Sequence, residues 1–195
     1  MALALSLHSY HNITQNTEEK ESLLIQACVK EEAWAQKILY ETYYPKMIGV
    51  CMRYSNDYED ARDILNEGFI KVFRFIEKYK IGTSLESWIR RIMINSSIDY
   101  YRKEIRHRSE DIDTAMYKLS DQTDVVSDFS AQDILKAVQK LPPAYRAVFN
   151  LYVIEGYSHK EVSEELGITE STSRSNLVKA RNRLKDMLEE LGITR

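Results

Sequence analysis

Apolar residues recur at steps of three and four along most of the 195-residue chain, the spacing that gathers them on one face of an α-helix. Six glycines and three prolines are few for this length, which favours long helices over a turn-rich β fold. The pattern therefore predicts an all-α protein. The expected helices start near Glu18, run from about Glu31 to Tyr54 and from Asp57 to Tyr79, cover Trp88 to Arg108 and Ser130 to Leu141, and then occupy Pro143 to Gly156, Ser158 to Leu166, and Thr169 to beyond Lys185.

An acidic segment divides this helical pattern into two parts. Residues 109 to 133 carry seven acidic residues against one lysine, and apolar residues are sparse there, as is typical of a linker. We therefore expect two small helical domains, over residues 21–108 and 133–190, joined by an acidic linker over 109–132 and preceded by a flexible tail over 1–20. Within the first domain, Pro45 interrupts a helical pattern, so we expect a kink or a break there.

The last 40 residues contain the signals of a helix-turn-helix. Ser158 and Glu161 form a capping box, in which each side chain satisfies a free backbone donor at the start of a helix. Gly167 suits the left-handed residue that ends this short helix, and Thr169 suits the cap of the next one. A short helix, a turn containing glycine and a longer helix are the helix-turn-helix pattern of DNA-binding proteins.

The outward face of the last helix carries a local positive charge. Residues 169 to 185 hold five basic residues against one acidic residue, whereas the whole chain has a net charge of −3. Small hydroxyls allow close approach to base edges, and arginine and lysine suit phosphates. An ordinary helical hairpin with a solvated charged face is the alternative. The candidate DNA contacts are Glu170, Ser171, Thr172, Arg174, Ser175, Lys179 and Arg181.

Two more polar stripes lie on predicted helices of the first domain. Asp60, Asp63 and Glu67 share one helical face with Asn66 beside them, which indicates a solvated surface, a docking face for a basic partner or, more weakly, a metal site. The helix over residues 88–108 has six basic residues against two acidic ones. On it, four polar side chains fall within an arc of about 60°, a stripe that suits either a nucleic-acid backbone or a solvated edge. These four are Arg91, Asn95, Arg102 and Arg106.

The remaining composition excludes several classes of protein. The isoelectric point near 5.9 means that any nucleic-acid binding must rest on local patches. No segment is long and apolar enough for membrane insertion, and Cys28 and Cys51 stand apart in apolar patterns, which indicates free buried thiols and a cytoplasmic protein. The four histidines are scattered, so we expect no catalytic residue, no metal and no cofactor.

Three motifs, in this order, resemble the extracytoplasmic-function sigma factors, which direct bacterial RNA polymerase to promoters. The first is D-A-x-D-hydrophobic-hydrophobic-Q-E-x-F, read here from Asp60 to Phe69 with Asn66 in place of glutamine. The second is W-hydrophobic-x-x-I-x-x-N-x-x-I-D-x-x-R, matched by Trp88, Ile92, Asn95, Ile98, Asp99 and Arg102. The third is L-P-x-x-x-R-x-V-F before the helix-turn-helix, matched by Leu141, Pro142, Arg146, Val148 and Phe149.

The resemblance implies a partner for each stripe. Asp60, Asp63, Asn66 and Glu67 would dock on the clamp helices of the β′ subunit of core RNA polymerase, with the β subunit as a further contact. The loop from Lys80 to Ser87 would hold a base flipped from the minus-ten element, and the last helix would read the minus-thirty-five element of promoter DNA. The minus-ten contacts would be Lys80, Thr83, Ser84, Leu85, Arg91, Asn95, Arg102 and Arg106.

The resemblance also implies a path for the linker and a further partner. The acidic linker would thread the RNA-exit path of the polymerase, and an anti-sigma factor would be the further partner. The chain departs from the family at Leu85, where many members carry an aromatic residue, and at Ser173, where an apolar residue is usual on the packed side of the recognition helix. A helix-turn-helix regulator that works without polymerase, with a sensor or dimerisation domain in its N-terminal half, is the alternative function.

Overall fold

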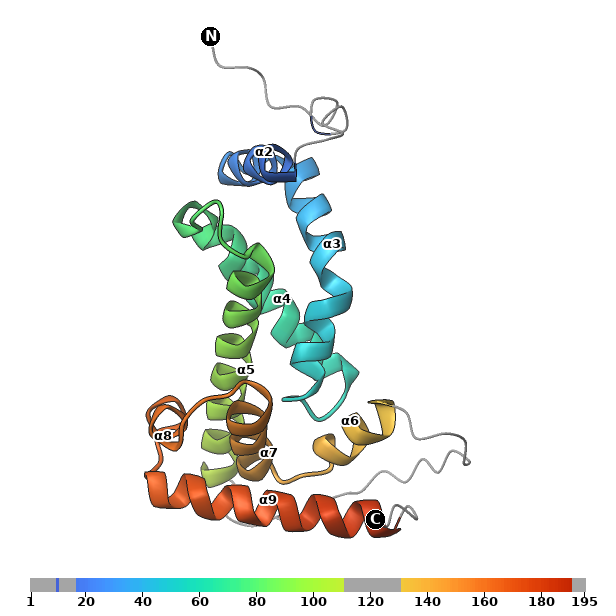
Figure 1. Ribbon diagram of the computed structural model, residues 1–195, viewed down its shortest axis with the longest axis vertical. Coiled ribbons are helices and arrows are strands. Elements are labelled where there is room, and N and C mark those ends of the chain that lie inside the picture. The colour runs from blue at the N-terminus through green and yellow to red at the C-terminus, as the bar shows by residue number, and fades with distance from the viewer. Residues whose placement is uncertain (1–9, 11–16, 111–130, 191–195) are drawn as a thin grey trace. The chain divides into compact units, whose positions relative to one another are not determined.

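The protein is built of helices, as its hydrophobic pattern predicts. The structure is a computed structural model that describes Tyr10 and residues 17–110 and 131–190, and within these residues it contains no strand (Figure 1). The elements are α2 (Thr17–Val29), α3 (Ala33–Met52), α4 (Tyr58–Phe75), the 3₁₀ turn η1 (Ile76–Lys78), α5 (Leu85–Glu110), α6 (Ala131–Gln139), α7 (Pro143–Phe149), the π-helical η2 (Asn150–Ile154), α8 (His159–Leu166) and α9 (Glu170–Glu190).

The chain forms two compact units that do not follow the acidic segment. Unit 1 consists of Met1–Cys51 and Arg62–Ser96, and unit 2 consists of Met52–Ala61 and Ser97–Arg195. The helices α4 and α5 therefore contribute to both units. Residues 111–130, which include most of the expected acidic linker, and most of the expected N-terminal tail lie outside the described residues. The division at residues 108 and 133 stays a prediction.

The apolar stripe of α4 lies in the core of unit 1. Leu65, Phe69 and Val72 are each no more than 2% exposed. Gly68, on the same helix, allows α5 to approach closely, because a Cβ atom placed there would lie 2.3 Å from Sδ of Met93. This glycine is therefore required by packing.

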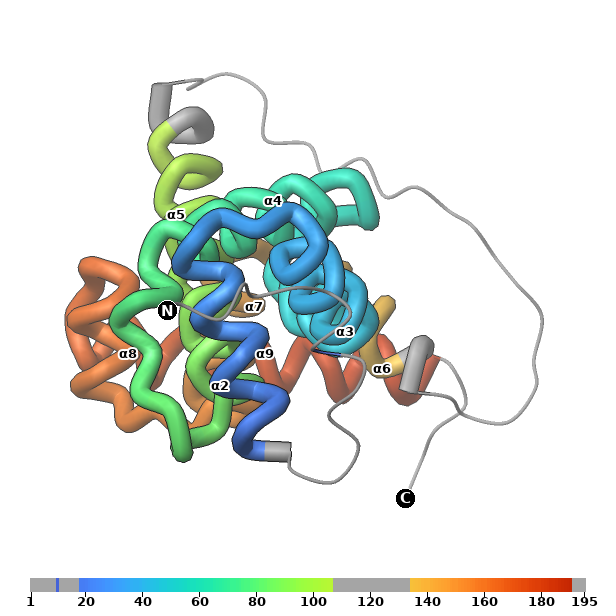
Figure 2. The backbone as a smooth tube through the Cα atoms, turned by 90° about the horizontal axis from the view of Figure 1, so that it is seen from above, coloured from blue at the N-terminus to red at the C-terminus, as the bar shows by residue number. Residues whose placement is uncertain are grey.

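The start of unit 1 is held against the turn that follows α4. Helix α2 packs on η1, and the two lie side by side in Figure 2. The hydroxyl of Tyr79 donates to Glu21 Oε1 at 2.9 Å, and its ring lies 5.7 Å from that of Trp88. The turn before α5 is therefore fixed by contacts from a helix about 60 residues earlier in the chain.

Pro45 does not break α3, which is continuous from Ala33 to Met52. Proline removes the hydrogen bond to the carbonyl of the residue four positions earlier. That residue is Glu41, which is exposed, as is Pro45 itself, so water can satisfy the freed carbonyl. Of the expected kink or break, the break was therefore wrong, and the kink stays a prediction.

The three helices α7, α8 and α9 make the core of unit 2. Figure 1 shows α9 lying across α7 and α8, and α9 packs on both of them and on α6. Pro143 occupies the first turn of α7, as expected. Ile134 of α6 is an apolar residue that is 53% exposed. The buried side chains of this core are Leu141, Val148, Leu151, Val162, Leu166, Leu177 and Ala180.

A buried arginine joins distant parts of unit 2. Arg146 of α7 is 1% exposed, and its Nη1 donates to the carbonyl oxygens of Ser55 at 2.7 Å and Gln139 at 2.9 Å. Its Nη2 donates to Oδ1 of Asn56 at 2.7 Å. Nearby, Nδ2 of Asn150 donates to the carbonyl of Arg53 at 2.6 Å. The segment after α3 thus has its backbone carbonyls satisfied by side chains that come some 90 residues later.

Candidate nucleic-acid interface

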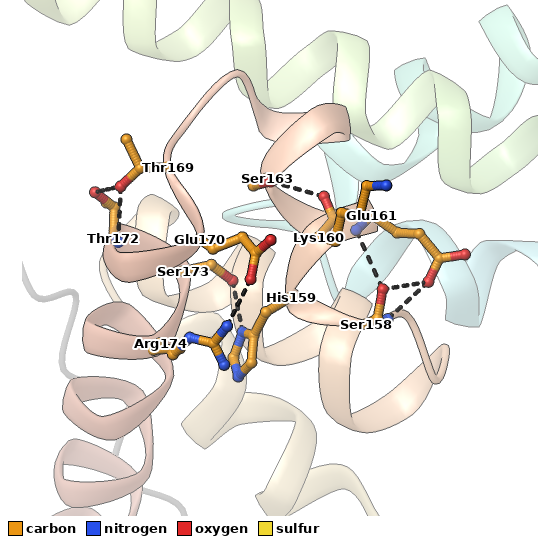
Figure 3. A network of polar contacts seen from close by, with 10 residues as sticks. All are labelled: Ser158, His159, Lys160, Glu161, Ser163, Thr169, Glu170, Thr172, Ser173 and Arg174. Carbon is orange, nitrogen blue, oxygen red and sulfur yellow. Dashed lines mark hydrogen bonds and ion pairs between the residues drawn. The ribbon is translucent and has the colours of Figure 1, made fainter.

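Local hydrogen bonds fix the start of α8 and the start of α9 (Figure 3). Ser158 Oγ accepts from the backbone N–H of Glu161 at 3.2 Å, and Glu161 Oε2 accepts from the backbone N–H of Ser158 at 2.8 Å. Gly167 ends α8 with φ of 66°, a left-handed conformation that glycine adopts without strain. Thr169 Oγ1 then accepts from the N–H of Thr172 at 3.1 Å, which caps α9. The capping box, the glycine and the second cap were all predicted, and all are confirmed.

The predicted reading face of α9 is exposed to solvent. Arg174 and Glu170 form an ion pair one turn apart, and Figure 3 shows both side chains beside the turn. Nζ of Lys179 lies 5.9 Å from the centre of the Tyr145 ring, so its charge is held over α7. The helix therefore presents hydroxyls and guanidinium groups on one side. The exposed candidates are Glu170, Ser171, Thr172, Arg174, Ser175, Lys179 and Arg181.

The packed face of α9 contains a polar contact that the sequence did not reveal. Ser173 is fully buried, and its Oγ lies 2.9 Å from Nδ1 of His159, the first residue of α8. The His159 ring stacks on Tyr152, with ring centres 4.3 Å apart and planes 23° apart. Burial lowers the pKa of His159 below its usual 6.5, and the charges of Arg174 and Arg181 lower it further. The neutral ring is therefore favoured.

The acidic face of α4 is exposed along most of its length. Asp63, Asn66 and Glu67 are exposed in unit 1, where Asn66 Oδ1 accepts from the hydroxyl of Tyr40 at 3.3 Å. These three side chains present two carboxylates and one amide to solvent. The face therefore remains available to a basic partner.

Asp60 differs from the other acidic residues of α4 because it already has partners. Within unit 2 its Oδ2 accepts from the hydroxyl of Tyr100 at 2.6 Å and from Nδ2 of Asn56 at 3.2 Å. Burial and the bond to this carboxylate raise the pKa of Tyr100 well above its usual 10. The phenol stays protonated and remains a donor to Asp60.

The loop before α5 is short and internally bonded. Thr83 Oγ1 donates to the carbonyl of Lys80 at 2.7 Å, and Ser84 Oγ accepts from the N–H of Ser87 at 3.2 Å, which caps α5. Lys80, Thr83 and Ser84 are exposed, whereas Leu85 is only 3% exposed and packs inside unit 1. The side chain of Leu85 thus packs in the core of unit 1 under the loop and is not exposed to solvent.

The polar stripe of α5 is exposed at all four positions. Arg91 and Asn95 belong to unit 1, and Arg102 and Arg106 belong to unit 2. Nη2 of Arg102 donates to the carbonyl of Glu165, and the carboxylate of Glu165 lies 3.8 Å away. Arg102 is thereby held against α8 in this structure, and DNA would have to compete with Glu165 for it.

Sequence reasoning missed Arg146, Asn150 and His159 as structural determinants of this interface. Arg146 and Asn150 stand four residues apart, so they share one face of a helix whose neighbours are apolar. Two polar residues on such a buried face are a signal for long-range hydrogen bonds. Ser173 stood out in the sequence as a polar residue on the packed side of the last helix, but no local pattern pointed to His159, 14 positions earlier, as its partner.

The described residues contain no group of three or more histidine, cysteine, aspartate or glutamate side chains placed to hold a metal ion. None of the described helices is long and apolar enough to cross a membrane.

A three-helix core that presents a capped, positively charged helix after a glycine turn defines the helix-turn-helix class of DNA-binding proteins.

Comparison with known proteins identifies the family. The model of Sigma-70 region 2 matches residues 39–107, and the model of Sigma-70 region 4 matches residues 131–184. RNA polymerase sigma factor SigZ of Bacillus subtilis is 31% identical over 135 residues, which cover 69% of this chain and 76% of SigZ. The ECF RNA polymerase sigma factor SigE of Mycolicibacterium smegmatis is 32% identical over 155 residues, which cover 77% of this chain and 60% of SigE.

Among solved structures, the sigma factor RpoE of Bartonella quintana, in complex with the anti-sigma factor NepR, has the same fold. Its TM-score is 0.50 at 21% identity, over 78% of this chain and 96% of that one. The chain belongs to the extracytoplasmic-function family of RNA polymerase sigma factors.

Proposed function

We propose that this sigma factor binds core RNA polymerase and directs it to promoters, with separate parts of the chain reading two promoter elements. The observation that carries the proposal is that one chain has both an exposed basic helix in a helix-turn-helix and an exposed acidic helix face. A DNA-binding regulator needs only the first of these. The regulator that works without polymerase is therefore the weaker alternative.

The recognition helix α9 would enter the major groove of the minus-thirty-five element. Thr169 caps its first turn, and the exposed hydroxyls of Ser171, Thr172 and Ser175 lie close to that end, where a recognition helix contacts base edges. Arg174, Lys179 and Arg181 would bind phosphates or guanine edges, with Glu170 orienting Arg174 through their ion pair.

The acidic face of α4 would dock on the β′ clamp helices, with further contact to the β subunit. Asp63, Asn66 and Glu67 supply exposed acceptors for basic side chains, and Asp60 extends the same helix face. Asp60 would have to exchange its bond to Tyr100 for one to polymerase. The docking role therefore depends most on Asp63 and Glu67.

The segment from Lys80 to Arg106 would bind the minus-ten element. Lys80, Thr83 and Ser84 line an exposed loop at the start of α5, and Arg91, Asn95, Arg102 and Arg106 follow along that helix. A flipped base needs polar groups and a stacking surface. Leu85, which is buried, would contribute to the base pocket through the position of the loop rather than through stacking.

The protein would act in the cytoplasm without catalytic residues, metal or cofactor, as an initiation factor whose chemistry belongs to polymerase. An anti-sigma factor is the expected further partner, as for the RpoE neighbour, which was solved in complex with NepR. The acidic segment over residues 109–132 would follow the RNA-exit path.

Run-off transcription with purified core polymerase on a genomic fragment library tests the proposal. The protein should produce discrete transcripts that core polymerase alone does not produce, and their upstream sequences should share two spaced elements. Nanomolar binding to duplex DNA without polymerase, together with an absence of promoter-specific transcripts, would establish the regulator instead.

A further inference from the structure

Ser173 is a polar residue on the packed face of the recognition helix. It is fully buried, and the next residues on the same face, Leu177 and Ala180, are buried apolar side chains. Buried hydroxyls are almost always hydrogen-bonded, and Ser173 meets this requirement through Nδ1 of His159 at 2.9 Å. The contact joins the first full turn of α9 to the first residue of α8.

The imidazole that Ser173 contacts is itself held in place. His159 directly follows the cap residue Ser158, so the position of its backbone is set by the capping box. Its ring stacks on Tyr152 of η2 at 4.3 Å. Figure 3 shows the ring lying between the start of α8 and the first turns of α9, pointing toward Ser173. Three elements thus meet at one directional contact.

We propose that the hydrogen bond between His159 and Ser173 is a positioning contact that fixes the rotation of α9 about its own axis and so determines which bases its exposed face discriminates. The inference rests on the proposed reading of the minus-thirty-five element by α9. Ser173 is buried and does not touch DNA, so it acts through Thr172 and Arg174, its neighbours in the chain.

Hydrogen bonds to base edges require the rotation of α9 to be fixed within a few degrees, which is why a directional contact matters. A rotation of about 10° moves an atom at about 6 Å from the helix axis by about 1 Å. Hydrogen bonds to base edges tolerate only about 0.5 Å in length. An apolar contact at residue 173 would be non-directional and would resist such a rotation only weakly.

The test uses the full chain with core polymerase and two pairs of variants. His159→Phe keeps an aromatic ring for stacking on Tyr152 and removes the nitrogen, whereas His159→Asn keeps a polar atom at the position of Nδ1 and removes the ring. Ser173→Ala removes the hydroxyl. The matched control is Ser163→Ala, because Ser163 Oγ donates only within its own helix, to the carbonyl of Lys160 at 2.7 Å.

The readout is selection of transcribed templates from a promoter library in which the minus-thirty-five element is randomised and the rest is kept constant. Ser173→Ala and His159→Phe should lower the enrichment of preferred over disfavoured bases by about tenfold, as much as one good base contact supplies. His159→Asn and Ser163→Ala should keep the enrichment of the native chain. Co-purification with core polymerase and total transcript yield on an extended minus-ten template should not change.

Two outcomes separate this inference from the proposed function. If the native chain shows no enrichment at the randomised element, α9 does not read it and the proposed reading fails. If the native chain shows enrichment and Ser173→Ala and His159→Phe keep it, the reading stands and the positioning role is wrong. A loss in His159→Asn that His159→Phe does not share would also overturn the role, since stacking on Tyr152 rather than the hydrogen bond would then fix the helix.

Discussion

Single side chains set the geometry of the helix-turn-helix, and His159 is the one whose charge can change near neutral pH. Its ring is partly buried between Tyr152 and Ser173, and Arg174 and Arg181 add positive charge nearby. The nearby carboxylate of Glu170 favours the charged ring but does not outweigh these effects. Protonation therefore costs more in the folded chain than in the unfolded one.

This lowered pKa predicts a dependence of stability on pH. Because the unfolded chain binds a proton at His159 more readily, the stability that His159 contributes is complete above about pH 6.5 and falls as the pH drops below that value. Thermal unfolding followed by circular dichroism at pH 7.5 and 5.5 should show a smaller decrease for His159→Phe than for the native chain. Equal decreases would mean that His159 titrates as it does in the unfolded chain.

A second residue-scale prediction concerns the free thiols. Cys28 and Cys51 are both buried, as expected from sequence, and burial raises the pKa of Cys28 to about 12. The thiolate is the reactive form, so Cys28 should resist alkylation by iodoacetamide at pH 7.5 and react once the chain is unfolded in urea. Mass spectrometry of the labelled peptide measures this. Rapid labelling of Cys28 in the native chain would contradict its burial.

At the scale of single elements, α4 has a buried apolar face and an exposed acidic face on opposite sides. One face packs through Leu65, Phe69 and Val72, and the other exposes Asp63 and Glu67. Because the exposed carboxylates do not contribute to the core, their charge can be changed without loss of the fold. The helix can therefore be tested for docking separately from its role in folding.

Reversing the charge on this face should prevent docking. Asp63→Arg combined with Glu67→Arg should abolish co-purification with core polymerase, because like charges would then face the basic clamp helices. The helical circular dichroism spectrum should stay native. The matched control is Arg62→Glu, which reverses a charge on the same helix outside the acidic face. Unchanged co-purification of the double arginine variant would refute the docking role.

Contacts between residues close together in the sequence could be predicted, whereas contacts between residues far apart could not. The helix start at Asp57, the capping box at Ser158 and the left-handed Gly167 involve residues within four positions, and all are confirmed. The burial of Leu85 and the exposure of Ile134 were not predicted, because helical periodicity does not show which neighbours cover a given face.

At the scale of the whole molecule, the compact units are made from segments that are far apart in the chain. Unit 2 combines Met52–Ala61 with the C-terminal half, and Arg146 bonds to Ser55 and Asn56 across 91 and 90 residues. No local pattern predicts such pairs. The hydrogen bonds of Arg146 therefore join residues that lie on either side of the acidic segment in the sequence.

Removing Arg146 should therefore destabilise unit 2. Arg146→Met keeps much of the side-chain volume but leaves two backbone carbonyls and the Asn56 amide oxygen without their donor. Each such loss costs about 1–3 kcal/mol, so the free energy of unfolding in urea should fall by about 3 kcal/mol or more. Arg74→Met, which replaces an exposed arginine of α4, is the control. A change below about 1 kcal/mol would show that these bonds do not persist in solution.

The length of α9 limits where promoter preference can arise. Its 21 residues span about 31 Å, whereas the major groove is about 12 Å wide. The fully buried positions of the helix, from Ser173 to Ala180, cover only about 10 Å of this length. If α9 enters the groove by its first turns, as proposed, the residues beyond Arg181 would lie past the groove, and substitutions there should change how tightly a promoter is held while leaving the choice of promoter the same.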